Sequence, residues 1–179
     1  MAEIKSTLEL VLERTRHLTL TDEEKREHAL SEFKADVNGL LQKYQDGVLN
    51  LERLEKEVRA LQEKTQFTGN EIIMHEAVQR LSLEDENGPL LDLLTEICGV
   101  NARPIASVLK QYRDTMESEA NERIVRTMAQ LTKRGIKGSA VVPNLRADKE
   151  WTAQRMEIQE RLGEKLAREA AMLKATARP

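Results

Sequence analysis

Histidine and cysteine are the first side chains to examine for chemistry in this chain of 179 residues, which contains three histidines and one cysteine. His75 and Glu76 match the first two residues of the zinc-protease helix motif. Gln79, however, occupies the position where the second histidine would bind the metal. Cys98 lies in a leucine-rich segment, where burial raises the pKa of a thiol and suppresses the reactive thiolate. We therefore expect no metal site, no cofactor and an inert cysteine.

Neighbouring carboxylates could support acid–base chemistry if a pocket raised the pKa of one of them. The chain offers Glu23-Glu24 and the run Glu84-Asp85-Glu86. Both lie where helices start or the chain turns, and acidic groups at such places cap helices and face water. No nucleophile, base and orienting group can be named together, so no catalytic residue is expected and the chain is not expected to be an enzyme.

A basic stretch between residues 123 and 149 is the strongest signal of a binding surface. It contains seven Lys or Arg residues and one Asp, a net charge of +6. Gly135, Gly138 and Ser139 could present amide donors to an anion, although the spacing differs from that of a phosphate-binding loop. The candidate anion contacts are Arg126, Lys133, Arg134, Lys137, Ser139 and Arg146. Alternatively, these cations complement a helix C-terminus and the acidic half of the chain.

Composition favours long helices over a deep globular core. Only 3% of the residues are aromatic while 33% are charged. Residues 1–100 carry 12 basic and 21 acidic side chains (net −9), and residues 101–179 carry 16 and 10 (net +6). This asymmetry favours antiparallel self-association, contacts between the halves or an anionic partner. A single cysteine, no secretory leader and no long apolar run predict a cytoplasmic protein without integral membrane association.

Helix signals organise the first third of the chain. An apolar stripe predicts an amphipathic helix over 3–17, for which a membrane-surface role is the weakest alternative. The sequence Thr21-Asp-Glu-Glu24 matches a capping box, which predicts that a second helix begins at about Asp22. Gly47 and Asn50 then favour a hairpin of helices over about 22–45 and 50–66. One continuous helix is the alternative, because the heptad register runs through Gly47 without a slip.

The apolar stripes of this hairpin are the predicted partner or oligomer interface. Their residues recur at alternating steps of three and four, the spacing of coiled-coil positions a and d. They are Leu30, Phe33, Val37, Leu40, Tyr44, Leu51, Leu54, Val58 and Leu61.

Three further segments complete the helical pattern. Pro89 and Gly99 bound a short, nearly all-apolar helix over 89–98, which is the expected centre of a small core. A long helix should run from about 101 to 134, packed at both ends and solvated in its middle. Residues 135–147 form an irregular loop whose only β-like run is 140–142, and Asp148 caps a final helix.

The sequence thus predicts an all-α protein with helical hairpin or coiled-coil arms, a small helical core and one irregular loop near 135–147. The predicted regions are an acidic hairpin region at 1–66, short core helices at 67–100 and a basic region at 101–179. The predicted function is non-enzymatic interaction or assembly, as an adaptor or structural protein with protein partners and homo-oligomers. The alternative is a ribosome- or nucleic-acid-associated factor that uses residues 123–149.

Overall fold

A computed structural model describes residues 21–65, 67 and 70–176, and these residues form helices and loops without a β-strand. The predicted all-α class is therefore confirmed. The chain divides into two compact units, residues 1–69 and residues 70–179. The helix predicted over 3–17 lies outside the described residues.

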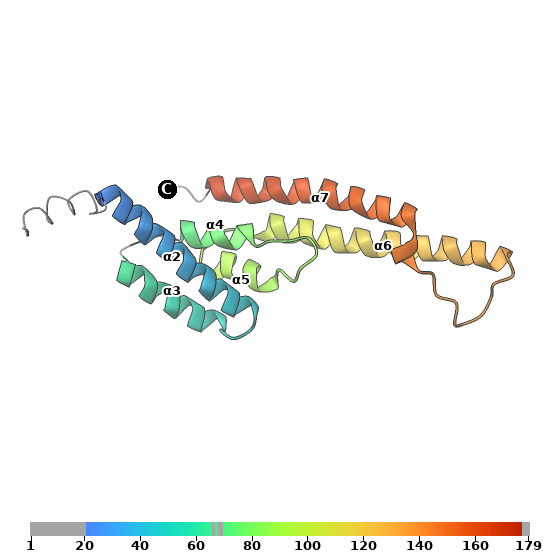
Figure 1. The fold of residues 1–179 in the computed structure, drawn as a ribbon, viewed down its shortest axis with the longest axis horizontal. Helices are drawn as coiled ribbons and strands as arrows, with labels where there is room; N and C mark the ends of the chain where they lie inside the picture. Colours follow the sequence, from blue (N-terminus) through green and yellow to red (C-terminus); the bar gives the residue numbers. More distant parts are fainter. Residues whose placement is uncertain (1–20, 66, 68–69, 177–179) are drawn as a thin grey trace, which may run out of the picture. The chain divides into compact units, whose positions relative to one another are not determined.

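The first unit contains a hairpin of α2 (Asp22–Gln45) and α3 (Leu51–Thr65), which lie side by side in Figure 1. The predicted capping box starts α2: the Glu24 amide donates to Thr21 Oγ1 at 3.2 Å, and the Thr21 amide donates to Glu24 Oε2 at 2.6 Å. These two bonds satisfy amides that a helix start would otherwise leave without partners.

The turn between α2 and α3 decides between a hairpin and one long helix. Gly47 has φ of +72°, which glycine adopts without the steric cost that a Cβ brings. Its amide donates to the Tyr44 carbonyl at 3.0 Å, and the Val48 amide donates to the Lys43 carbonyl at 2.9 Å. The Arg53 amide donates to Asn50 Oδ1 at 2.9 Å and caps α3. The hairpin prediction is confirmed and the continuous helix is wrong.

The buried stripe of α2 differs from the predicted heptad positions at one place. Leu41 is fully buried, whereas Leu40 is half-buried. Successive helix residues point about 100° apart, so these two leucines flank the stripe on opposite sides, and periodicity does not decide which flank is covered. The buried seam of the hairpin consists of Phe33, Val37, Leu41, Tyr44, Leu54 and Val58.

The second unit begins with two short helices, α4 (Glu71–Gln79) and α5 (Gly88–Glu96), which contact one another. Leu90, Leu93 and Leu94 of α5 are fully buried, as expected for a central core helix. The loop before α5 is held by buried Asn87. Its side chain donates to the carbonyls of Ser82 at 2.6 Å and Asp85 at 2.8 Å, and accepts from the Ser82 amide at 3.1 Å.

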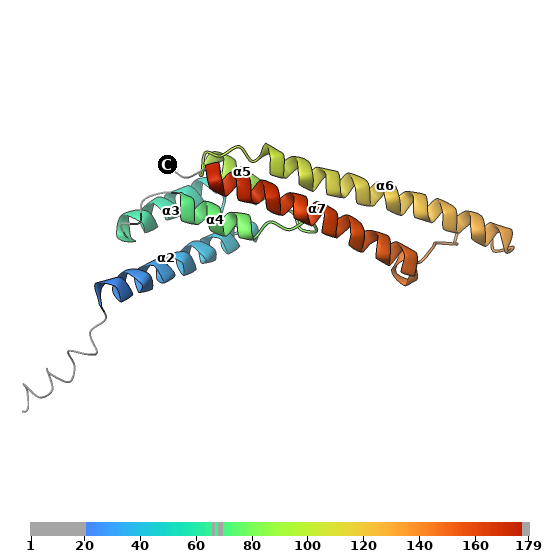
Figure 2. The same ribbon diagram turned by 90° about the horizontal axis from the view of Figure 1, so that it is seen from above.

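The long helices α6 (Arg103–Lys133) and α7 (Lys149–Thr176) form a second hairpin, visible in Figures 1 and 2. One of its apolar clusters contains Tyr112, Ile158 and Leu162, with Leu83 and Met116 packed against them. Contacts between α4 and α7 join the short helices to this hairpin within one unit, although the sequence-based division separated them at residue 100.

The prediction that α6 is packed at both ends and solvated in the middle is confirmed only in part: the buried residues of α6 lie in its first half, whereas Ile124, Met128 and Leu131 of the second predicted stripe are half-buried. Val125 near the C-terminal end is 68% exposed, whereas the polar middle contacts α7. Glu119 accepts a hydrogen bond from Gln154 at 2.5 Å, and Arg123 pairs with Asp148 at 2.6 Å. The spacing of the apolar residues predicted a buried stripe at the end of α6. However, α7 begins only at Lys149, and it contacts the polar turns of α6 around Glu119.

The connection between α6 and α7 is irregular, as predicted. The run 140–142 forms no strand, and Val142 is 81% exposed. A single-turn 3-10 helix, η1 (Leu145–Ala147), precedes α7. Asp148 Oδ1 accepts from the amides of Glu150 at 3.1 Å and Trp151 at 3.2 Å, so its predicted capping role is confirmed.

Candidate interaction surfaces

One side of the first hairpin carries a groove, which we call the α2–α3 groove, with a volume of about 370 Å³. Half-buried Leu40 and Leu61 lie in it, and the other lining residues are small or charged. A Cβ built at Gly39 would meet no atom within 4 Å, so the space above this glycine is open. The lining residues are Ala35, Asp36, Gly39, Leu40, Lys43, Glu57, Ala60, Leu61 and Lys64.

The charged residues of this groove differ from those elsewhere on α3. Exposed residues of α3 form ion pairs one turn apart, such as Glu52 with Lys56 at 2.7 Å. Asp36, Lys43, Glu57 and Lys64 form no ion pair with any residue that the structure describes. Their charges therefore remain available to a molecule that enters the groove.

The structure divides the nine predicted interface residues into two sets. Phe33, Val37, Tyr44, Leu54 and Val58 are buried and are not presented to a partner. The half-buried set consists of Leu30, Leu40, Leu51 and Leu61. Of these four, Leu40 and Leu61 line the α2–α3 groove. The intervening alanines and glycine carried no coiled-coil signal, so sequence reasoning missed the groove.

The cations predicted to contact an anion fall into paired and unpaired groups. Arg126 pairs with Glu122 at 2.8 Å. Arg123, from the same basic stretch, pairs with Asp148 and with Glu150, each at 2.6 Å. Arg123 donates hydrogen bonds to Asp148 and Glu150, and these bonds raise the pKa of Arg123 above its ordinary value and lower the pKa of Asp148 below its ordinary value. Arg123 therefore links α6 to the start of α7, and Arg126 forms an ion pair within α6.

The remaining cations lie around the exposed connection, and we call them the basic tip: Lys133, Arg134, Lys137, Arg146 and Lys149. All five are exposed, and the structure gives none of them an ion pair within the described ranges. Ser139 lies exposed in the same connection, next to Gly138, which has φ of +141°. The basic tip is thus an open cationic surface rather than an enclosed anion site.

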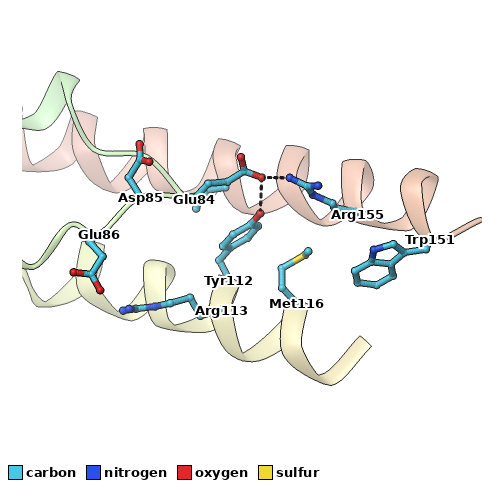
Figure 3. A pocket seen from close by; sticks show the side chains of 9 residues that line it. Glu84, Asp85, Glu86, Tyr112, Arg113, Met116, Trp151 and Arg155 are labelled. Carbon is cyan, nitrogen blue, oxygen red and sulfur yellow. Dashed lines mark hydrogen bonds and ion pairs between the residues drawn. The ribbon is translucent and has the colours of Figure 1, made fainter. Parts of the chain in front are cut away.

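A second groove lies beside the α6–α7 hairpin and was not anticipated from sequence. Figure 3 shows Glu84 at its centre, where its carboxylate accepts hydrogen bonds from the Tyr112 hydroxyl at 3.4 Å and from Arg155. Its volume is about 510 Å³, and Met116 and Trp151 also line it. Burial and then the negative charge of Glu84 raise the pKa of Tyr112, so the phenol stays protonated at neutral pH. This arrangement ties the loop at Glu84 to both long helices.

Cys98 and His75 are the side chains that the sequence offered first for chemistry. Burial raises the pKa of Cys98 to about 12, which confirms the expected suppression of its thiolate. His75 contacts Gln79 within 3.2 Å and faces water. Across the described ranges, no group of three or more His, Cys, Asp or Glu side chains is close enough to hold a metal ion. No helix in the same ranges is long and apolar enough to cross a bilayer.

Comparisons with protein-family models, curated proteins and solved structures found no match to this chain. What the α2–α3 groove, the basic tip and the groove at Glu84 can bind therefore follows from their own residues.

Proposed function

We propose that this protein is a non-enzymatic helical assembly protein that binds a second copy of itself through the α2–α3 groove. The supporting observation is the open space above Gly39, between the half-buried side chains Leu40 and Leu61. A docked helix would bury the apolar surface that these leucines leave exposed, and burial of apolar surface is the main driving force of association.

Gly39 supports a close approach of another helix. Glycine in a helix interior costs roughly 1 kcal/mol relative to alanine, and no neighbour within 4 Å requires it here. Interaxial distances between packed helices depend on the side chains at the contact, so a missing Cβ lets another backbone come nearer. A second copy supplies such a helix without any further partner.

The mass of the protein in solution tests this function. Light scattering over a hundredfold range of concentration should give a mass that rises from 20.4 kDa toward twice that value. Unfolding should move to higher temperature over the same range, because dimerisation stabilises only the folded chain. A mass of one chain at every concentration would exclude self-association.

The second candidate function is binding to RNA or a ribosome, and the unpaired cations of the basic tip favour it. Cations that displace counterions from phosphates give affinities that fall steeply with salt. A double variant, Arg134→Glu and Lys137→Glu, should weaken binding of a structured RNA and flatten this salt dependence. Lys110→Glu is the control, since Lys110 is exposed on the body of α6 outside the basic tip. Equal effects of the tip and control variants would remove this candidate.

A further inference from the structure

The order of charges along the α2 wall of the groove constrains how a second copy can lie there. Asp36 and Lys43 are seven residues apart, about 10.5 Å along the axis and on one face of the helix. Gly39 and Leu40 lie midway between them. The pattern therefore has an acidic end, a small and apolar centre, and a basic end.

Such a pattern is complementary to itself only when one copy is reversed. If two α2 helices cross antiparallel at Gly39 and Leu40, Asp36 of each copy faces Lys43 of the other. A parallel crossing in the same register would place like charges together, which costs free energy and disfavours that arrangement. Because α3 runs antiparallel to α2, the charges of the α3 wall stand in the opposite order along the groove, with Lys64 toward the Asp36 end and Glu57 toward the Lys43 end. The α2 charges therefore determine the orientation only where the two α2 helices themselves cross.

We infer that the second copy docks with its α2 antiparallel to the first α2, in a two-fold arrangement centred on Gly39 and Leu40, with two ion pairs between Asp36 and Lys43. This inference rests on the proposed self-association and specifies its geometry. Two-fold contacts use the same surface on both copies, so each favourable pair occurs twice. The apolar centre supplies affinity, while the charges determine orientation.

Charge reversal and its rescue test this geometry. Asp36→Lys places two lysines opposite one another at two places in the dimer, and the dissociation constant should rise by at least about tenfold. Adding Lys43→Asp exchanges the charges and should return the constant to within about threefold of the parent value. Glu27→Lys is the matched control, because Glu27 is exposed, lies nine residues before Asp36 and therefore points to the opposite side of α2.

The outcomes separate the geometry from the function. A parent chain that never dimerises would overturn both. A dimer that is indifferent to Asp36→Lys, or that is rescued by Lys64→Asp instead of Lys43→Asp, would overturn the α2-to-α2 pairing and leave self-association intact. Circular dichroism should show the same helix content in every variant, which ensures that a lost dimer is not a lost fold.

A second variant tests the close approach. Gly39→Gln introduces a better helix former with room for its Cβ, so the isolated chain should melt at a higher temperature while dimerisation is lost. Ser31→Gln places the same side chain at an exposed position away from the groove and should leave dimerisation unchanged. An unchanged dissociation constant for Gly39→Gln would contradict a contact at this residue.

Discussion

The two helical hairpins of this protein are stabilised in different ways. The α2–α3 hairpin has a short turn and an apolar seam, and its ion pairs lie on the surface within single helices. The α6–α7 hairpin has a long irregular connection, and polar bridges join its helices on both sides of the contact at Tyr112. The first hairpin therefore depends on apolar packing and turn geometry, whereas the part of the second hairpin near its connection also depends on polar bridges between the helices.

The largest expected effect follows from the apolar seam of the first hairpin. Leu41→Ala should lower the free energy of unfolding by about 2–5 kcal/mol, because Leu41 is fully buried and its loss leaves a cavity. Leu40→Ala should cost only about 1 kcal/mol or less, since that side chain is half-buried. Urea unfolding at a concentration where the chain is monomeric measures both. Equal costs would contradict the seam described above.

The turn geometry gives the next largest effect. Gly47→Ala should destabilise the protein by about 1–2 kcal/mol, the cost of placing a Cβ at a left-handed φ. Gly135→Ala introduces the same conflict at φ of +82°, but the long connection that follows α6 can adjust and should reduce the loss. The two variants can be compared by thermal unfolding. A greater loss at Gly135 would reverse the contrast between the turns.

The α6–α7 hairpin offers a stabilising change of smaller size. Gly163→Ala should raise the free energy of unfolding by about 1 kcal/mol, because alanine is the better helix former. Its Cβ would lie 3.8 Å from Leu83 Cδ1, an ordinary contact distance. Ala167→Gly, at an exposed position one turn further along α7, should lower the stability by a similar amount. A loss of stability in Gly163→Ala would indicate tighter packing there.

The smallest expected change in stability depends on pH and is confined to the contact between Arg123 and Asp148. The Arg123 hydrogen bonds hold the pKa of Asp148 below its ordinary value in the folded chain. The stabilisation is therefore present above the unfolded pKa of Asp148 and is lost as pH falls through its lower, folded pKa. Carboxyl NMR titration should give Asp148 a low pKa, which Arg123→Gln returns toward the ordinary range.

The buried seam of the first hairpin is the internal control for this acid titration, because its stability depends on apolar packing. Hydrogen exchange should show that α7 opens at its first turns in acid while the seam residues keep their protection, because apolar side chains form the seam and the ion pairs of α3 lie on its surface. The start of α2 should also fray in acid, since the backbone hydrogen bond from Thr21 lowers the pKa of Glu24. Acid-induced loss of protection at Leu54 and Val58 would contradict the apolar account of the seam.

Local features of the sequence determined much of the fold. The capping box at Thr21 and Glu24, the turn at Gly47 and the cap at Asp148 were all predicted and confirmed. Each depends on hydrogen bonds and backbone angles among residues only a few positions apart, so nearby side chains suffice to specify it. The sequence likewise predicted the raised pKa of Cys98, because leucine-rich surroundings desolvate the thiol.

Only the tertiary structure decided which flank of each stripe is buried and which charges meet. Leu41 rather than Leu40 is fully buried, and Arg155 bonds to Glu84 from 71 residues away. Periodicity gives the face of a helix within about one residue, and charge counts give no pairing, because both outcomes depend on how separate helices are placed. The α2–α3 groove has the same origin: its residues lie on two helices, and only the fold brings Gly39 and Leu61 together along one side of the hairpin.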